Sequence, residues 1–296
     1  MAKEAEGRSP RTLSDYGKYL HAFDRWLGGS AVAELTPVAV SRYVAERQRG
    51  SRYAARYISA VLKSFASWLA LMGYVATPLG TSVLAGVRTP RVDRRREPCT
   101  DDEVRMMIRT LNATSDRTRA RDKAVVLTLL ATGLRLNELR ELQVADTHIE
   151  RPIEQSYVFV RAETSKSREA RKVRLDRLAA QAVHEYVRGL RPFTGTGGAL
   201  FLTEGGKPFS LCGFKNYMAR LRGAFEAAGI KDWMAHRARH YWATSAHRTG
   251  MTVFDIAAEG GWRDLKMVQR YTHERPFEEL QRLPTPLSAA LGQRAV

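Results

Sequence analysis

The sequence predicts a mainly α-helical protein with a small β-sheet, arranged as a helical N-terminal domain followed by a larger α+β domain. A chain of 296 residues is long for one hydrophobic core and suits two domains. Apolar residues recur at helical spacing along most of the chain, whereas only two short segments, both in the second half, are strand candidates. A proline- and arginine-rich segment separates the two parts. We therefore expect domains at 1–85 and 99–296, joined by a basic linker at 86–98.

The first domain is expected to contain three helices. The first carries apolar residues at helical spacing and ends at the glycine pair 28–29: Tyr16, Leu20, Phe23 and Leu27. A second begins at Thr36, an N-cap residue followed by a proline at the first helical position, and runs to about Arg49. The third carries an apolar stripe that ends near Gly73 and that we interpret as core: Tyr57, Val61, Leu62, Phe65, Trp68 and Leu69.

Basic side chains between these apolar positions are candidates for contacts with DNA: Arg42, Arg47, Arg49, Arg52, Arg56 and Lys63. The linker holds two prolines and five arginines, which suits an extended segment that follows a phosphate backbone. Three of its arginines join the candidates for DNA binding: Arg94, Arg95 and Arg96. A solvated run of charge is the alternative interpretation of this segment.

The formal net charge of +17 favours a polyanionic partner. Arginine supplies 38 of the 48 basic residues, and its planar fork matches phosphate oxygens better than an ammonium group does. Residues 1–98 carry a net charge of +8 and residues 99–296 carry +9, so both halves are expected to touch that partner. A basic protein from an arginine-rich proteome is the alternative, and charge by itself does not decide between the two.

The pattern restarts in the second domain, where Thr100 and Glu103 form a predicted capping box. Residues 121–132 are expected to form a buried helix that ends at Gly133. Two short strands are predicted at 157–161 and 171–175, joined by a polar turn that contains Lys166. Further helices are predicted at about 176–189, 211–228, 238–249, 252–259 and 264–271.

The two cysteines form no CxxC pair and no disulfide framework. We interpret Cys99 as a linker residue and Cys212 as a small apolar filler. No apolar segment follows the N-terminus and no stretch approaches 18 apolar residues, so we expect a soluble, cytoplasmic protein with no membrane partner.

Five residues, taken in order, suggest a site that attacks a DNA phosphate. Cleavage by direct displacement requires that the phosphate charge be neutralised, that a nucleophile lose a proton and that the leaving 5′ oxygen gain one. Two guanidinium forks meet the first need, a histidine or lysine serves proton transfer, and a tyrosine is the nucleophile. The candidates are Arg135, Lys166, His236, Arg239 and Tyr271. Each residue by itself is more often an ordinary surface or packing residue, and only their joint order and spacing favour the site.

In these motifs the chain resembles the tyrosine recombinases of the phage-integrase and Xer type. Thr-Gly-Leu-Arg is followed by Glu138, and a run from Ser165 to Leu175 matches the hairpin that carries the family's lysine. The family's His-x-x-Arg-His, its Leu-Gly-His-Ser element and its tyrosine motif correspond to three further segments: His236, Arg239 and His240; Gly260 to Arg263; and Tyr271 to His273.

Three departures from the family pattern stand out. Trp262 replaces the usual histidine, so imidazole chemistry is lost there, although an indole N–H can still donate to a phosphate. Serines replace the two glycines beside Lys166. The spacer between Arg135 and Lys166 is longer than usual, which predicts an insertion around residues 146–155.

The resemblance implies a SAM-like core-binding domain and a catalytic domain that close around duplex DNA as a C-shaped clamp. It implies that Tyr271 forms a 3′-phosphotyrosyl bond, needing neither ATP nor a metal or other cofactor, and that Arg135, Lys166, His236, Arg239 and Trp262 are catalytic. Glu138 is then expected to support the arginine pair, and His240 to act from behind or on the phosphate. Tyr241 is the next candidate nucleophile if Tyr271 fails.

The expected partner is double-stranded DNA at a specific recombination site. The enzyme is expected to be monomeric or weakly associated in solution and tetrameric in the synaptic complex. An apolar C-terminal tail is expected to dock on a neighbouring protomer, or else to pack on its own domain: Phe277, Leu280, Leu283 and Leu287. The alternative functions are a DNA-binding protein that does not cut, a relaxing enzyme like the type IB topoisomerases, and a metal-dependent nuclease. Phage, transposon and chromosomal roles all stay open.

Overall fold

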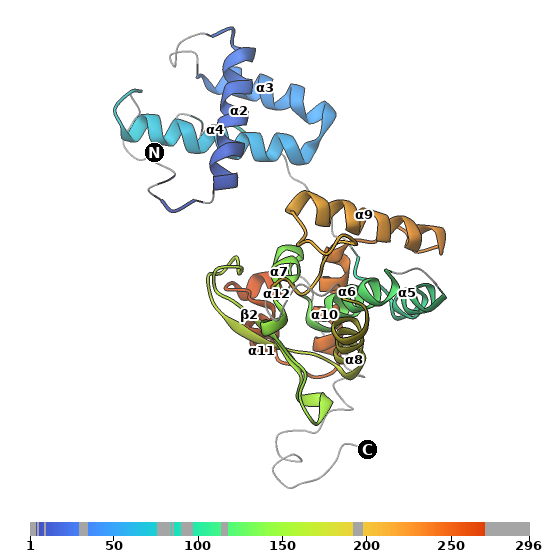
Figure 1. Cartoon of the computed structure of the whole chain (residues 1–296). Coiled ribbons are helices and arrows are strands. Elements are labelled where there is room, and N and C mark those ends of the chain that lie inside the picture. Colours follow the sequence, from blue (N-terminus) through green and yellow to red (C-terminus); the bar gives the residue numbers. More distant parts are fainter. Residues whose placement is uncertain are drawn as a thin grey trace, which may run out of the picture. The chain divides into compact units, whose positions relative to one another are not determined.

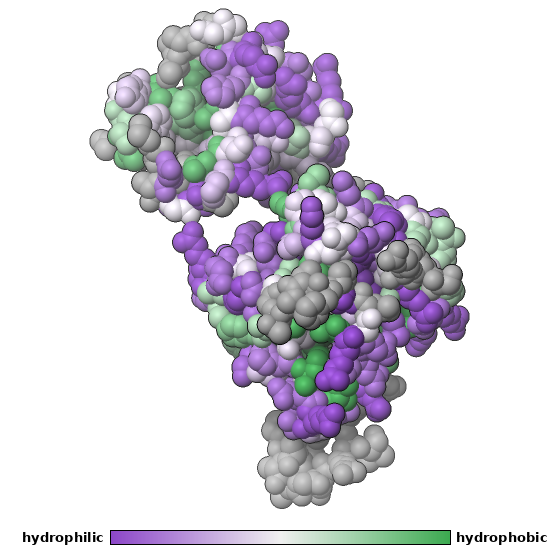
Figure 2. Space-filling model, viewed as in Figure 1, coloured by the Kyte–Doolittle hydropathy of each residue, from purple (hydrophilic) through white to green (hydrophobic). Residues whose placement is uncertain are grey.

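The computed structural model describes residues 4, 6–8, 10–29, 35–75, 84, 86–89, 97–113, 118–191 and 198–269. The chain divides into two compact units, Met1–Arg95 and Arg96–Val296, and each has its own hydrophobic core (Figure 1). This division falls inside the segment interpreted as a linker. Residues 90–96 lie outside the described residues, so the linker and its limits stay a prediction. Hydrophilic side chains cover much of the visible face of each unit (Figure 2).

The first unit contains the three helices expected from the sequence: α2 (Pro10–Trp26), α3 (Pro37–Gly50) and α4 (Arg52–Leu71). Thr36 caps α3, because its side chain accepts a hydrogen bond from the Ala39 N–H at 3.2 Å. The stripe on α4 is core, as predicted: Val61, Leu62 and Leu69 are buried, and the large rings of Phe65 and Trp68 pack against the cluster that contains Leu62 and Leu69. Tyr57 differs, since 38% of it is exposed.

The second unit is mostly helical, and the helices expected from the sequence are present: α5 (Asp101–Ala113), α6 (Arg119–Thr132), α8 (Arg177–Glu185), α9 (Leu211–Ala227), α10 (Ala235–Arg248), α11 (Val253–Gly260) and α12 (Leu265–Gln269). The short helix α7 (Leu136–Glu141) was not predicted. Helix α6 is buried almost throughout and packs against α5, α8 and α10. The predicted capping box of α5 is confirmed, since Thr100 and Glu103 exchange hydrogen bonds of 2.9 and 3.1 Å.

Gly133 ends α6 in a left-handed conformation, with φ of 58°. A Cβ atom at this position would lie 2.5 Å from the Trp242 ring on α10. Both the backbone conformation and the close approach therefore require glycine here. The turn that follows directs the chain into the residue that opens α7, Arg135.

The sheet has three antiparallel strands in the order β1 (Thr147–His148), β2 (Tyr157–Val160) and β3 (Arg171–Arg174). Val158 pairs with Val173 and both are fully buried, so this face of the sheet belongs to the core. The sheet lies beside α11, against which β3 packs (Figure 1). The two strands predicted from the sequence are confirmed, together with the mainly helical fold with a small sheet. Strand β1 lies at the start of the predicted insertion and was not expected.

Both interpretations of the cysteines are wrong. Cys99 is only 2% exposed and belongs to the core of the second unit, where burial raises the pKa of its thiol to about 11. Cys212 is exposed on the first turn of α9. A single small residue carries no periodicity, so whether it lies inside or outside cannot be predicted from the sequence around it. Within the parts of the chain that the structure describes, no helix combines the length and the apolar character needed to cross a membrane.

Candidate active site

A cleft of about 720 Å³ in the second unit brings together the predicted catalytic residues that the structure describes. Its walls come from the start of α7, the turn between β2 and β3, the start of α10, and the loop between α11 and α12. The predicted residues on these walls are Arg135, Lys166, His236, Arg239 and Trp262. Segments more than a hundred residues apart in sequence therefore share one concave surface, as the hypothesis of a site requires.

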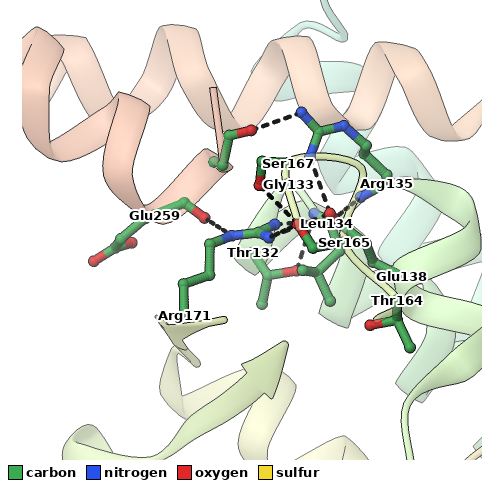
Figure 3. A network of polar contacts seen from close by, with 12 residues as sticks. Thr132, Gly133, Leu134, Arg135, Glu138, Thr164, Ser165, Ser167, Arg171 and Glu259 are labelled. Carbon is green, nitrogen blue, oxygen red and sulfur yellow. Dashed lines mark hydrogen bonds and ion pairs between the residues drawn. The ribbon is translucent and has the colours of Figure 1, made fainter. Parts of the chain in front are cut away.

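Arg135 is fixed from three sides at the start of α7 (Figure 3). Its backbone N–H donates to Glu138 Oε2 at 2.9 Å, and its Nη1 donates to Glu138 Oε1 at 2.9 Å. Nη2 donates to the Gly261 carbonyl oxygen at 2.8 Å, across the cleft on the loop after α11. A quarter of the side chain is exposed. The guanidinium is thus held in place before any phosphate arrives.

Glu138 is 2% exposed and lies between two arginines. Besides Arg135, it accepts hydrogen bonds from Arg171 Nη2 at 2.9 Å and Arg171 Nη1 at 3.2 Å (Figure 3). Burial acts to raise the pKa of the Glu138 carboxyl, but the Arg171 hydrogen bond and the two arginine charges outweigh it and lower that pKa. An ionised Glu138 braces Arg135 against Arg171. The expected support of the other arginine, Arg239, stays a prediction.

The sequence interpretation gave no role to Arg171, which stands on β3 and is 9% exposed at its side chain. Its Nε donates to the Glu259 carbonyl oxygen at 2.6 Å, at the end of α11 (Figure 3). One guanidinium therefore connects β3, α7 and α11. Strand alternation is the signal that could have found it, because Arg171 lies two residues before the buried Val173 and shares its face.

Arg239 lies deeper, with 4% exposure, on the first turns of α10. Its Nη1 donates to the Gly133 carbonyl oxygen at 2.5 Å and its Nη2 to the Gly260 carbonyl oxygen at 2.6 Å. These carbonyls belong to the turns that end α6 and α11. The guanidinium plane is therefore set by backbone groups from both sides of the cleft.

Trp262 covers this guanidinium with its ring. The Arg239 guanidinium carbon lies 3.8 Å from the centre of the indole, and the indole stacks on Trp242 with ring centres 6.1 Å apart. A side chain at Gly260 would collide with the Trp262 ring. The residue that replaces the usual histidine thus packs as a flat cover on an arginine.

Lys166 is exposed on the turn between β2 and β3 and lines the cleft. The serines on either side of it are buried, and their hydroxyl oxygens lie 2.8 Å apart, within hydrogen-bonding distance. Arg263 donates from Nη2 to the Ser167 carbonyl oxygen at 2.5 Å and to Glu169 Oε1 at 3.0 Å. The turn is therefore tied to the loop between α11 and α12.

His236 and His240 lie one turn apart on α10, with ring centres 4.4 Å apart. His236 is exposed and lines the cleft, whereas His240 lies behind it and is not among the lining residues. The neighbouring Tyr241 packs against the core, and burial is the main reason that the pKa of its phenol is raised. A phenol that holds its proton more tightly is a poor substitute nucleophile.

Several predicted residues lie outside the described residues, and the roles given to them stay predictions: Tyr271, Arg94, Arg95, Arg96 and the tail residues from Phe277 to Leu287. The described part of the second unit ends at Gln269 in α12, whose Met267 lines the cleft. Tyr271 follows two residues after this helix ends.

The candidates for DNA binding in the first unit lie on α3 and α4. Five of them are exposed, as expected of residues that contact a partner: Arg42, Arg47, Arg49, Arg52 and Arg56. Lys63 is half-buried and donates to Thr89 Oγ1 at 3.2 Å, so its amine also ties the segment at 86–89 to α4.

The charged residues on the cleft walls are mostly cations. Arg135, Lys166, Arg239 and Arg263 line it together with a single acid, Asp264. Among the described residues, no three His, Cys, Asp or Glu side chains are grouped so that they could hold a metal ion. The cleft is thus built to receive an anion.

Comparison with known proteins identifies the family. The model of the phage integrase family matches residues 99–277, and the model of the phage integrase N-terminal SAM-like domain matches residues 2–73. The chain is 30% identical over 283 residues to tyrosine recombinase XerD of Corynebacterium glutamicum, covering 90% of this chain and 88% of that protein. It is 29% identical over 251 residues to tyrosine recombinase XerC of Herpetosiphon aurantiacus, covering 81% and 78%.

Solved structures of recombinases share the fold. The Tn1549 transposon integrase in complex with a circular intermediate DNA superposes with a TM-score of 0.74 at 17% identity, over 94% of this chain and 95% of that chain. A lambda integrase dimer bound to a core site gives 0.71 at 18% identity, over 93% and 92%. Together with the cationic cleft, these matches lead to one conclusion. The chain belongs to the phage integrase family and is a tyrosine recombinase, an enzyme that breaks and rejoins DNA strands.

Proposed function

We propose that this recombinase cleaves one strand of a specific DNA site with Tyr271. The tyrosine oxygen attacks the phosphorus, the bond to the 5′ oxygen breaks, and a 3′-phosphotyrosyl bond replaces it. A 5′ hydroxyl from a partner duplex then reverses the reaction, so the energy of the phosphodiester is conserved. The observation that carries this proposal is the cationic cleft that gathers Arg135, Lys166, His236 and Arg239. Met267 of α12, four residues before Tyr271 in the sequence, lines the same cleft.

The two arginines neutralise the charge on the non-bridging phosphate oxygens. Arg135 and Arg239 are each held by hydrogen bonds to backbone carbonyl oxygens of the loop after α11, so their positions are fixed relative to one another. Donors fixed in advance stabilise a developing charge without the cost of reorganisation, and removing one typically reduces the rate by about 10²–10³. Glu138 acts on the reaction through Arg135, which it braces.

Proton transfer falls to Lys166 and His236. A phenol with a pKa of about 10 must lose its proton, and the leaving 5′ oxygen must gain one. Lys166, on an exposed turn at the rim, is proposed to give its proton to the leaving oxygen. His236, exposed on the opposite wall, is proposed to accept the phenol proton or to bind the phosphate. Trp262 packs on Arg239 and supplies no acid–base group.

Duplex DNA is the proposed partner of both units. The net charge of +17 and the exposed arginines of α3 and α4 support this, as do the relatives solved with DNA.

We further propose that the enzyme forms a tetramer on paired sites, assembled through the apolar tail after residue 275. We also propose that it is located in the cytoplasm, where such DNA is found. Truncation before residue 275 is expected to abolish synaptic complexes while leaving single-site binding intact.

Two other functions are less well supported by the family to which the chain belongs. A binding protein that does not cut would form no covalent adduct. A relaxing enzyme would form the adduct and remove supercoils, but would yield no recombined product from two sites.

Nicked DNA provides the test. The sequence that Tyr271→Phe protein binds best is selected and nicked on the 3′ side of each candidate phosphate, so that the short fragment released with a 5′ hydroxyl diffuses away after cleavage. Wild-type protein with a chelator present is expected to give a denaturant-resistant protein–DNA band, and Tyr271→Phe is expected to bind equally and give none. Tight binding by wild type without any band would overturn the proposal.

A further inference from the structure

The turn that carries Lys166 is held by Arg263, a residue that was not among the predicted catalytic residues. Arg263, in the loop between α11 and α12, uses one nitrogen to contact both the Ser167 carbonyl oxygen and the Glu169 carboxylate. These acceptors lie one and three residues after Lys166. Arg263 lines the same cleft as Lys166, so the contact is made at the rim where the lysine stands.

The turn that carries Lys166 is also held by its own backbone hydrogen bonds and by a contact from Arg171 on β3. The Ser165 N–H donates to the Arg161 carbonyl oxygen at 3.2 Å, and the Arg168 N–H donates to the Ser165 carbonyl oxygen at 3.1 Å. Arg168 adopts a positive φ of 56°, which closes the turn tightly. Arg171 Nη1 lies 3.5 Å from the Ser165 hydroxyl (Figure 3). Arg263 thus completes a set of contacts that surrounds Lys166 without touching its amine.

The side chain at position 263 decides whether this outer contact exists. The family element that this segment resembles ends in serine, and a serine is too short to span the distance that the arginine covers. The ion pair to Glu169 is exposed, with 66% and 62% of the two side chains accessible, so it contributes little to stability. Its expected effect is therefore on geometry: it holds the turn that carries Lys166 in place relative to the loop that contains Trp262.

We propose that Arg263 is a positioning residue for Lys166. By holding the Ser167 carbonyl and Glu169 against the loop that follows Trp262, it keeps the Lys166 ammonium at the cleft rim, where the leaving 5′ oxygen takes its proton. This inference rests on the proposed role of Lys166 as the general acid. A shift of about 1 Å in a group that takes part in the chemistry can reduce the rate about a hundredfold.

The leaving group offers a test that separates positioning of an acid from contact with the phosphate. In a nicked substrate whose bridging 5′ oxygen is replaced by sulfur, the leaving thiolate needs no proton, so loss of the general acid no longer matters. On ordinary DNA, Lys166→Ala is expected to form adduct about 10²–10⁴ times more slowly than wild type. Arg263→Ser is expected to be slower by about 10- to 100-fold. Both losses should disappear on the sulfur substrate, and Arg263→Ser should add nothing to Lys166→Ala.

A matched control accounts for the loss of one surface charge. Arg105 on α5 has the same exposure, 65%, and a single ion pair, to Asp102, but it is not among the residues lining the cleft. Arg105→Ser should form adduct at the wild-type rate on both substrates. Hydrogen exchange of free protein gives an independent readout: the amides at 165 and 168 should exchange several-fold faster in Arg263→Ser and unchanged in Arg105→Ser.

The remaining outcomes would each refute the inference. An Arg263→Ser defect that persists with sulfur, or that multiplies the Lys166→Ala defect, would mean that Arg263 contacts the phosphate itself. Wild-type rates in Arg263→Ser would mean that the contact has no role in cleavage. If Lys166→Ala is not rescued by sulfur while wild type still forms adduct, Lys166 is not the acid; the role of Arg263 then falls with it, but tyrosine cleavage stands.

Discussion

The guanidinium carbon of Arg239 lies 3.8 Å from the centre of the Trp262 ring, which also stacks on Trp242 with ring centres 6.1 Å apart. Because the two Nη groups of Arg239 are already committed to the Gly133 and Gly260 carbonyls, the indole removes the remaining freedom of the guanidinium plane. A tryptophan at the position of the family's histidine thus orients Arg239, and this is a physical explanation for the departure from the family pattern.

Two substitutions of Trp262 distinguish the contribution of its aromatic ring from that of its indole N–H. Trp262→Phe keeps a flat ring on Arg239 and should retain covalent adduct formation within about threefold, because a cation–π contact at a partly exposed position contributes only about 0.5–1 kcal/mol. Trp262→Ala removes the cover and is expected to be slower by about tenfold or more. Adduct formation on nicked DNA measures both. Equal defects in the two variants would show instead that the indole N–H, donating to the phosphate, is what matters.

Glu138 is expected to make the stability of the fold depend on pH in the acidic range. Its folded-state pKa lies below the ordinary value of 4.5, so the stability it adds is fully present above that value and is lost as pH falls through the folded pKa. Glu138→Gln leaves two arginines facing a neutral amide and should lower the free energy of unfolding by about 3 kcal/mol at neutral pH. Urea unfolding at several pH values checks this. A difference between the variants that stays constant down to strongly acidic pH would contradict it.

Arg171 is expected to affect cleavage through Arg135. Arg171→Lys keeps the positive charge but cannot donate to Glu138 and to the Glu259 carbonyl in the same fork geometry. We expect adduct formation to fall about 10- to 100-fold while binding of DNA by the same variant changes little.

Arg174→Lys is the matched control, on the same strand but with 66% of its side chain exposed and one carboxylate partner, Glu259. It should cleave at the wild-type rate. If Arg171→Lys and Arg174→Lys lose activity equally, a general effect of replacing arginines on β3 explains the result, and the bracing of Arg135 through Glu138 does not.

Gly133 is expected to tolerate no side chain. Gly133→Ala places a methyl group 2.5 Å from the Trp242 ring at a positive φ, and it shifts the carbonyl that Arg239 binds. A loss of about 2 kcal/mol or more in the free energy of unfolding should follow. Gly229→Ala also has a positive φ but no atom within 4 Å of the added Cβ, so it isolates the backbone term. Equal losses in the two variants would show that steric contact with Trp242 is unimportant.

The sequence was informative wherever a local rule acts. Caps at Thr36 and Thr100, the glycine after α6 and the spacing of apolar residues predicted the helices, because these depend on neighbours within a turn. The ordered motif predicted which side chains would share a cleft. Strand β1 was missed because two residues carry no alternation.

The rest depends on contacts between distant residues. Arg171 meets a backbone carbonyl 88 positions away, and Arg263 meets the turn 96 positions away, so no local pattern identifies the partners of either residue. Trp262 was correctly identified as a departure, but its stacking on Arg239 depends on where α10 and α11 pack. Such partners are set by tertiary packing, which single-sequence periodicity does not report.

The most direct test of the account is to find the nucleophile chemically. Covalent adduct from nicked DNA is digested with nuclease and trypsin, and the peptide that carries the nucleotide is identified by mass spectrometry. Trypsin does not cleave the Arg275–Pro276 bond, so cleavage after Arg270 and Arg282 releases residues 271–282, in which Tyr271 is the only tyrosine. The account predicts the nucleotide on this peptide, linked through its 3′ phosphate. A nucleotide on another peptide, such as one that contains Tyr241, would contradict it.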